Sequence, residues 1–275
     1  MIAPFYEDDS VTLYHGDCRD ILPTLGMVDH VITDPPYEVE AHTLGRRGNT
    51  ARDGKSSFVA TRPIDFEAID EKTRKTVGFQ LATQSKGWIL VFAQVEAVTA
   101  WKEALEPAKY FRTQIWRKPN GACQFTGDRP GMGYEVIVTA WAGDGRSSWN
   151  GGGRHGFYVH NTVMNGTGHQ TEKPIGLMKE LIVLFSNFSD TILDPFAGSG
   201  TTLVAAKALG RKAIGIEKER KYCDVIVRRL SQEILPLTFN QPKKENDDGR
   251  NEQNLFARQF GKASGGKRAR DDETR

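Results

Sequence analysis

Residues 28–37 read Val-Asp-His-Val-Ile-Thr-Asp-Pro-Pro-Tyr, and the rest of the chain is organised around them. The first six residues include Val28, Val31 and Ile32 and predict a buried β-strand, which two prolines end abruptly. The turn would place the carboxylate of Asp34, the carbonyl group of Pro35 and the ring of Tyr37 at the carboxyl end of that strand, where open α/β sheets bind ligands. Two acceptors suit an –NH2 group with its two donors, and a tyrosine ring can stack on a planar ring. The stretch therefore predicts a site for a flat, amino-bearing base, although an ordinary strand-to-loop turn uses the same residue types.

The composition is that of an ordinary globular protein. The chain has 275 residues, enough for one large domain or two small ones, and its net charge of +2 is too small to indicate a nucleic-acid partner by itself. Its three cysteines are scattered and form no Cys-x-x-Cys pair, which argues against a cysteine-rich zinc site and indicates a reducing compartment. The acidic start lacks the apolar core of a signal peptide, and no apolar run is long enough to cross a membrane. We therefore expect a cytoplasmic protein with no metal and no membrane partner.

Apolar strands alternate with helical patterns along most of the chain. Besides residues 28–33, strands are predicted at 11–15, 87–92, 113–116, 135–141 and 212–216, helices at 71–84, 95–105, 175–185 and 218–230, and a strand, turn and helix over 191–209. The run at 87–92 is continuously apolar, as in a strand covered on both faces. This alternation predicts an α/β fold with a doubly wound, Rossmann-like and mostly parallel sheet.

A glycine-rich turn follows the strand that begins at Thr191. Its sequence, Asp194-Pro195-Phe196-Ala197-Gly198-Ser199-Gly200-Thr201-Thr202, lets the backbone approach a ligand at the start of the next helix. Leu203 stands where a dinucleotide fingerprint has its third glycine, and no Gly-Lys-Ser/Thr follows, so the turn fits neither NAD nor ATP well. Glu217 ends the next strand, the usual place of the acidic residue that binds ribose hydroxyls. Together these features predict a nucleoside ligand without a diphosphate.

Asp17 follows the first predicted strand and has two candidate roles. It can cap a short helix that runs to Leu25, or it can accept a hydrogen bond from the amino group or ribose of a ligand. The residue types leave both roles open.

Three irregular segments combine glycines with basic residues. They run from Glu38 to about Pro63, from Asn120 to Gly133 and from Gly143 to Val163. Basic residues interleaved with aromatic ones suit contact with a nucleic acid, although solvated loops have the same composition. The arginines that we assign to phosphate contacts are Arg46, Arg47, Arg52, Arg129, Arg146 and Arg154.

These motifs, in this order, resemble those of the DNA amino-methyltransferases that use S-adenosylmethionine. The sequence Asp34-Pro35-Pro36-Tyr37 is similar to their catalytic motif, and residues 194–202 are similar to their cofactor loop. The catalytic motif comes first, and Thr171-Glu172-Lys173-Pro174 directly precedes the cofactor half, which is the permuted order of the beta group. The resemblance covers roughly Val11 to Leu230, and the combination of motifs is highly specific.

The resemblance implies a role for each matching residue. The target base would be held by Asp34, Pro35, Pro36 and Tyr37. The adenine of the cofactor would lie at Asp17 and Cys18, and its ribose hydroxyls at Glu217. The methionine side of the cofactor would be lined by Asp34, Lys173, Asp194, Phe196, Gly198, Ser199, Gly200, Thr201 and Thr202.

The resemblance also implies a domain organisation and a partner. A methyltransferase domain would span residues 1–235, with a target-recognition segment at roughly 120–163 that the family motifs define least. Residues 236–275 are polar, carry charges of both signs and predict a disordered tail. The implied partner is double-stranded DNA in a bacterial or virus-infected bacterial cell, and since dimers are common in the beta group, we expect a homodimer as one state of the chain.

The implied reaction transfers a methyl group from S-adenosylmethionine to the N6 amine of an adenine that has left the duplex. Adenine is preferred because Asp leads the catalytic motif, whereas enzymes acting on cytosine N4 more often carry Ser there. Methylation of a cytosine carbon needs a cysteine nucleophile, and the Pro-Cys dipeptide of that family is absent from the sequence. A protein-glutamine methyltransferase would be expected to carry Asn at position 34 and the unpermuted order. Methylation of cytosine N4 is the second choice, because the division by the first motif residue is not strict. An RNA substrate and a non-catalytic DNA-binding role remain open as well.

Overall fold

The computed structural model describes residues 2–37, 68–121, 130–163 and 172–232. The contacts within the chain divide it into two units, Met1–Glu233 and Ile234–Arg275. The second unit, which contains the tail predicted from sequence, lies outside the described residues, and the fold below is that of the first unit.

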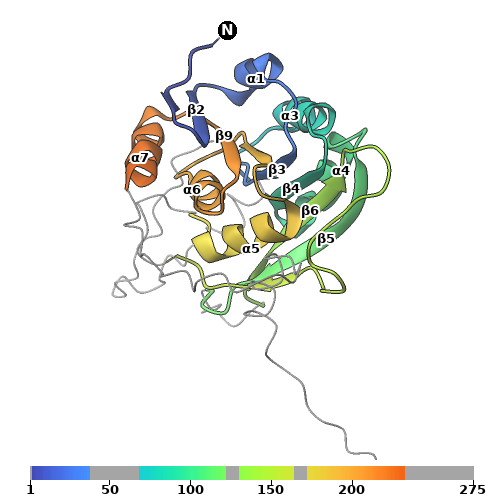
Figure 1. Cartoon of the computed structure of the whole chain (residues 1–275). Coiled ribbons are helices and arrows are strands. Elements are labelled where there is room, and N and C mark those ends of the chain that lie inside the picture. The colour runs from blue at the N-terminus through green and yellow to red at the C-terminus, as the bar shows by residue number, and fades with distance from the viewer. Residues whose placement is uncertain (1, 38–67, 122–129, 164–171, 233–275) are drawn as a thin grey trace, which may run out of the picture. The chain divides into compact units, whose positions relative to one another are not determined.

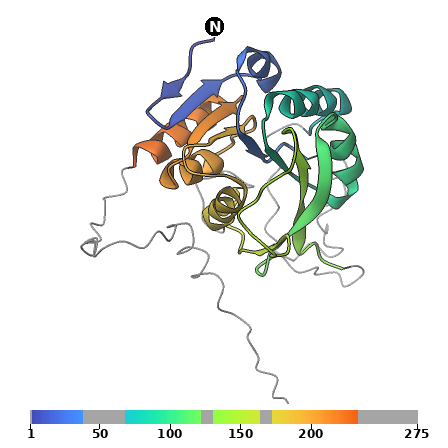
Figure 2. The same ribbon diagram turned by 45° about the vertical axis from the view of Figure 1, so that its right-hand side comes forward.

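A nine-stranded sheet runs through the described part of the chain, with the strand order β1-β2-β9-β8-β3-β4-β6-β5-β7 (Figure 1). The strands β2, β9, β8, β3 and β4 are parallel to one another, β1 and β6 pair antiparallel with this group, and β7 pairs parallel with β5. Figure 2 shows the blue N-terminal strands and the green strands β5 and β6 toward opposite ends of the sheet. The strands span Tyr6–Glu7 (β1), Val11–His15 (β2), His30–Thr33 (β3), Trp88–Ala93 (β4), Lys109–Arg117 (β5), Tyr134–Trp141 (β6), Phe157–Val159 (β7), Thr191–Asp194 (β8) and Lys212–Glu217 (β9).

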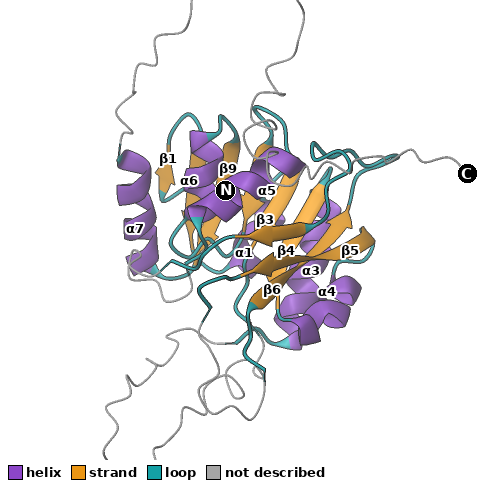
Figure 3. Cartoon of the chain, turned by 90° about the horizontal axis from the view of Figure 1, so that it is seen from below, coloured by secondary structure: helices purple, strands orange, loops and turns teal. Residues whose placement is uncertain are grey.

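Helices cover both faces of the sheet, because both faces of its central strands are apolar (Figure 3). One buried cluster joins the sheet to α5 (Ile175–Phe185), α6 (Thr201–Ala208) and α7 (Arg220–Ser231). The other joins it to α1 (Cys18–Ile21), α3 (Glu71–Gln84) and α4 (Val98–Ala104), with the 3-10 turns Leu22–Thr24 and Val95–Ala97 beside them. All six residues of β4 are buried. The predicted doubly wound, mostly parallel α/β fold is confirmed.

The crossovers from the middle of the sheet go in opposite directions. The chain passes from β3 through α3 to β4 on one side, and from β8 through α6 to β9 on the other. The neighbours β3 and β8 therefore flank the point where the strand order reverses, which in open α/β sheets is where ligands bind. None of the helices in the described ranges is long and apolar enough to cross a membrane.

Most elements form where the sequence predicts them, and the third irregular segment is the main exception. Residues 143–163 were expected to be a glycine-rich loop, but β7 forms within them and pairs with β5 through Ile115 and Phe157. Tyr158 is buried at this pairing, and its hydroxyl group donates to Gln114 Oε1 at 2.5 Å. The expectation was wrong here because tertiary pairing and one buried tyrosine, rather than local periodicity, define so short a strand. The edge strand β1 was not predicted, and β5 begins four residues earlier than expected, at Lys109 rather than Thr113.

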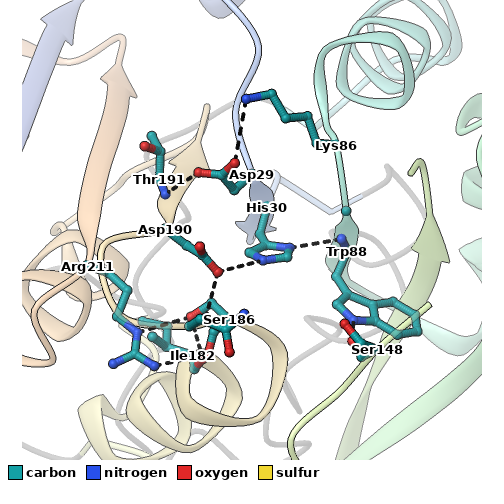
Figure 4. Close-up of polar contacts among 12 residues, drawn as sticks. Asp29, His30, Lys86, Trp88, Ser148, Ile182, Ser186, Asp190, Thr191 and Arg211 are labelled. Atoms are coloured by element: carbon teal, nitrogen blue, oxygen red, sulfur yellow. Dashed lines mark hydrogen bonds and ion pairs between the residues drawn. The ribbon is translucent and has the colours of Figure 1, made fainter. Parts of the chain in front are cut away.

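The amino ends of the central strands carry a half-buried polar cluster on the edge opposite the carboxyl ends (Figure 4). The His30 Nδ1 atom accepts from the backbone N–H of Trp88 at 3.0 Å, so Nε2 carries the proton that faces Asp190 Oδ2 at 3.1 Å. Nearby, Asp29 accepts from the backbone N–H of Thr191, and Arg211 donates to Ser186. These contacts join β3, β4 and β8, and the hydrogen bond from Trp88 to Nδ1 favours the neutral form of His30, whereas Asp190 favours the protonated form.

This arrangement makes stability depend on pH, since burial is the main cause that lowers the pKa of His30 below its ordinary value of 6.5. The unfolded chain then binds a proton before the folded one does, so the free energy of unfolding should fall as the pH drops from about 6.5 through the lower folded pKa. The variant His30→Asn keeps an oxygen acceptor but cannot titrate. We expect it to be about 1 to 2 kcal/mol less stable at pH 7.5 and to lose this part of the pH dependence. Urea unfolding between pH 7.5 and 5.5 measures both quantities. If the free energy of unfolding changed with pH equally in the wild type and the variant, the assignment to His30 would be contradicted.

Candidate active site

The carboxyl ends of four neighbouring parallel strands bring the candidate residues to one edge of the sheet. Asp17 follows β2, Glu217 ends β9, Asp194 ends β8 and Asp34 follows β3. The sequence predicted an acidic residue at the carboxyl end of each of these strands. Because the strands are parallel neighbours, their carboxyl ends bring the four residues side by side.

Asp34 is held by Lys173, which comes from the other half of the chain. The Lys173 ammonium contacts Oδ2 of Asp34 and lies 3.3 Å from Oε2 of Glu135, at the start of β6. It also lies over the rings of Tyr37, Phe92 and Trp116, at 5.5, 5.1 and 6.0 Å from their centroids. The Lys173 side chain is only 7% exposed, and its two carboxylates and three aromatic faces stabilise the buried positive charge.

One oxygen of the Asp34 carboxylate is left over. Oδ1 is buried and accepts no hydrogen bond of good geometry from the residues that the structure describes. The hydroxyl group of Tyr37 is equally buried and faces the carboxylates of Asp34 and Glu135, to either of which it can donate. Burial is the main cause that raises the pKa of Asp34, to about 6, against the lowering effect of Lys173. Burial and the nearby carboxylates of Glu135 and Asp34 raise the pKa of Tyr37, so it stays protonated. A buried unpaired acceptor is costly unless a ligand satisfies it, and Oδ1 thus has the chemistry of a docking point for an N–H donor.

The glycine turn after β8 is organised by the Asp194 carboxylate. Oδ1 accepts from the Thr33 hydroxyl at 2.7 Å and from the backbone N–H of Phe196 at 3.2 Å, and Oδ2 accepts from the Thr202 hydroxyl at 2.6 Å. Both oxygens are thereby engaged in joining the ends of β3 and β8 to the start of α6. The role that the geometry gives Asp194 is to shape the turn.

The turn uses left-handed backbone at two glycines, with φ of +54° at Gly198 and +79° at Gly200. A Cβ atom at Gly200 would lie 2.7 Å from Cγ1 of Ile226 on α7. We expect Gly200→Ala to lower the free energy of unfolding by about 2 to 3 kcal/mol, from the backbone conformation and the steric overlap together. The matched control is Gly152→Ala, which has φ of +57° and open space around the added Cβ, and which should cost only about 1 kcal/mol. Equal losses in the two variants, measured by chemical denaturation, would show that the contact with α7 is unimportant.

Glu217 and Asp17 differ in how far their carboxylates are engaged. Glu217 is 8% exposed and accepts from the backbone N–H groups of Gly198 at 2.8 Å and Glu219 at 2.7 Å. Burial is the main cause that raises the pKa of Glu217, to about 7. Asp17 caps α1 through the N–H of Arg19 and also pairs with the Arg19 guanidinium, so its capping role is confirmed. Cys18 is buried beside it as the first residue of α1.

Two side chains of this region carried no signal in the sequence. Arg229 on α7 donates to the carbonyl oxygen of Ser199 at 2.7 Å and pairs with Glu172 at 3.0 Å, so it ties the glycine turn to the segment that carries Lys173. Glu135 lies between Lys173 and Lys118. A charged residue near the end of a helix or at the start of an antiparallel strand looks like an ordinary surface residue in a sequence. Only the tertiary packing of α7 and β6 brings Arg229 and Glu135 to this region.

The structure describes two of the six predicted phosphate-binding arginines, Arg146 and Arg154. Arg46, Arg47, Arg52 and Arg129 lie outside the described residues. Arg146 is exposed in the segment before β7, and Arg154 pairs with Glu180 of α5 at 2.6 Å. No group of His, Cys, Asp and Glu side chains in the described ranges could hold a metal ion.

Comparison with known proteins gives a consistent result. A family model described as DNA methylase (N6_N4_Mtase) matches residues 28–228. The chain is 28% identical to the type II methyltransferase M2.LlaDCHI of Lactococcus lactis subsp. cremoris, over 84% of this chain and 93% of that protein. It is 26% identical to the type II methyltransferase M.HinfI of Haemophilus influenzae, over 84% of this chain and 74% of that protein.

Solved structures share the fold at lower identity. The M1.HpyAVI–SAM complex superposes with a TM-score of 0.61 at 23% identity, covering 80% of this chain and 99% of that one. The cytosine-N4-specific PvuII DNA methyltransferase superposes with a TM-score of 0.64 at 14% identity, covering 84% and 90%.

Since the family model spans most of the chain, the protein belongs to the DNA methylase family, whose members transfer a methyl group from S-adenosylmethionine to amino groups of DNA bases.

Proposed function

We propose that this protein methylates the exocyclic N6 amine of adenine in double-stranded DNA, at a site where Asp34 receives the amine. The observation that carries the proposal is the buried Oδ1 atom of Asp34, which accepts no hydrogen bond of good geometry among the described residues. It lies next to Pro35 and Tyr37 and at the strand end beside the glycine turn.

The lone pair of an exocyclic amine is delocalised into the ring of the base, which makes the nitrogen a weak nucleophile. Hydrogen bonds from the amine to Asp34 Oδ1 and to the Pro35 carbonyl would localise that lone pair on the nitrogen and direct it toward the methyl group of the cofactor. S-adenosylmethionine, when bound, supplies a methyl group already activated by a positively charged sulfur. Methyl transfer would form one N–C bond and break the S–C bond, and ionised Asp34 would accept the proton that the positively charged amine nitrogen then gives up.

The residues at the neighbouring strand ends suit a nucleoside with a methionine chain. Glu217 would accept the ribose hydroxyls, with Asp17 and Cys18 at the adenine. The turn from Phe196 to Thr202 presents backbone N–H groups and hydroxyls near the start of α6 and would face the methionine end. A target base must leave the duplex to reach Asp34, and Tyr37 would stack on it.

Adenine is favoured over cytosine because a carboxylate, not a hydroxyl group, leads the catalytic motif. The related proteins are named type II methyltransferases, which supports a role in marking DNA at particular sites. The irregular segments with Arg146 and Arg154 are the proposed contacts to the DNA backbone.

The proposal is tested by the modified nucleoside that the protein produces. Purified protein is incubated with S-adenosylmethionine and unmethylated bacterial genomic DNA, and the digest is analysed by mass spectrometry. The expected product is N6-methyldeoxyadenosine. If the product is N4-methyldeoxycytidine, the target base is cytosine and not adenine. If the protein binds the cofactor but yields no methylated nucleoside, the proposed substrate is wrong.

A further inference from the structure

Glu135 is a buried carboxylate at the catalytic edge to which the chemistry above gives no role. It lies in β6, whose antiparallel pairing with β4 places Val136 opposite Ala93, the last residue of β4. The start of β6 therefore lies at the same edge of the sheet as the carboxyl end of β3, from which Asp34 follows. The Glu135 side chain is only 15% exposed.

The contacts of Glu135 complete a row of alternating charges. Oε1 of Glu135 contacts the Lys118 ammonium, Oε2 lies 3.3 Å from the Lys173 ammonium, and Lys173 contacts Oδ2 of Asp34. The row reads Lys118, Glu135, Lys173, Asp34, and it ends at the unpaired Oδ1 atom. Each lysine in a row of this kind is balanced by a carboxylate, so burial of the four charges is tolerated.

From this geometry we propose that Glu135 is a positioning residue for the methyl transfer. It shares the Lys173 ammonium with Asp34, so that Lys173 fixes Oδ2 in place without drawing the whole negative charge of Asp34 to itself. Oδ1 is then kept oriented and electron-rich for the incoming amine. This inference rests on the proposed function of Asp34, and it adds the reason why a buried lysine can sit beside that carboxylate without disabling it.

The proposed role of Glu135 predicts the direction in which the pKa of Asp34 changes when the Glu135 charge is removed. The titratable groups that act on Asp34 from the surrounding elements are Tyr37, Glu135, Lys173 and Asp194, and Lys118 acts on Glu135. Lys173 lowers the pKa of Asp34 and Glu135 raises it. Loss of the Glu135 charge would leave Lys173 to Asp34 alone, so the pKa of Asp34 should fall below its raised value of about 6 and the carboxylate should become a weaker acceptor.

The test is the variant Glu135→Gln, which keeps the shape of the side chain and removes its charge. In the cofactor-free protein, a carbon-13 NMR titration of the aspartate carboxyl groups, with Asp34→Asn to assign the signal, should show a lower apparent pKa for Asp34 than in the wild type. In the methylation assay, kcat should fall by roughly ten- to a hundredfold, while the KM for S-adenosylmethionine stays within about twofold. The acid limb of the pH profile of kcat should move to lower pH. Glu103→Gln, an exposed glutamate on α4, is the control and should change none of these values.

An unchanged Asp34 titration and an unchanged kcat in Glu135→Gln would overturn the proposal. So would a joint loss of cofactor affinity and thermal stability, because that pattern marks a purely structural residue. If Glu135→Gln does not fold, Glu135→Asp keeps the charge but withdraws it from Lys173, and a wild-type kcat in that variant also overturns the proposal. If the wild-type protein methylates no nucleoside, the proposed function fails, whereas the NMR titration still decides whether Glu135 controls Asp34.

Discussion

Replacement of Asp34 by alanine is expected to reduce kcat by about a thousandfold or more, while the dissociation constant for S-adenosylmethionine changes by no more than about threefold. The variant removes the buried Oδ1 acceptor and leaves the target amine with the Pro35 carbonyl alone. Because Asp194, Glu217 and the glycine turn keep their own hydrogen bonds, the cofactor region should remain intact. Single-turnover methylation and isothermal titration calorimetry measure the two quantities separately.

The matched control for this variant is Asp9→Ala, which removes an exposed carboxylate from the turn between β1 and β2. It should leave both quantities unchanged. Normal turnover in Asp34→Ala would refute the role of the carboxylate in transfer. The same role predicts that wild-type kcat falls as the pH drops through about 6, because Asp34 must be ionised to accept the amine and burial raises its pKa to that value.

Replacement of Glu217 by alanine should weaken the binding of S-adenosylmethionine by about a hundredfold and leave kcat at saturating cofactor nearly unchanged. The variant removes the proposed acceptor of the ribose hydroxyls and frees the N–H groups of Gly198 and Glu219. Burial raises the pKa of Glu217 to about 7, so the ionised form is lost as the pH falls below that value. The wild-type protein should therefore bind the cofactor more weakly at pH 6 than at pH 8, and the variant should show no such difference.

Glu103→Ala is the control for this experiment, since it removes an exposed glutamate from α4 and leaves the surroundings of Glu217 unchanged. Calorimetry at both pH values compares the three proteins. Equal affinities for the wild type and Glu217→Ala would exclude Glu217 from the cofactor site.

The sequence predicts the elements whose limits are set by local chemistry. The helix α3 begins after Asp70, which caps it by accepting from the N–H of Thr73, and the helix α5 begins after Pro174. Both have the predicted bounds because capping residues and apolar periodicity are local signals. The strand-end residues Asp34, Asp194 and Glu217 also come together as predicted, since carboxyl ends of parallel strands share an edge.

What the sequence does not predict depends on the order of distant strands. Glu135 reaches Lys173 and the neighbourhood of Asp34 only because β6 inserts antiparallel between β4 and β5, and no local pattern encodes that insertion. The sequence also assigned Lys173 to the methionine end of the cofactor, whereas its contacts in the structure are with Asp34 and Glu135. The assignment to the cofactor stays a prediction, and the row of charges is the observed arrangement.

The most direct measurement of the central claim is a crystal structure of the protein with sinefungin, an analogue that carries an amine where the cofactor carries its methyl group. The ribose hydroxyls should lie within about 3.2 Å of the Glu217 carboxylate, and the amine should be directed toward Asp34. Sinefungin bound away from Glu217, or with its amine turned from Asp34, would contradict the assignment of this sheet edge as the site of methyl transfer.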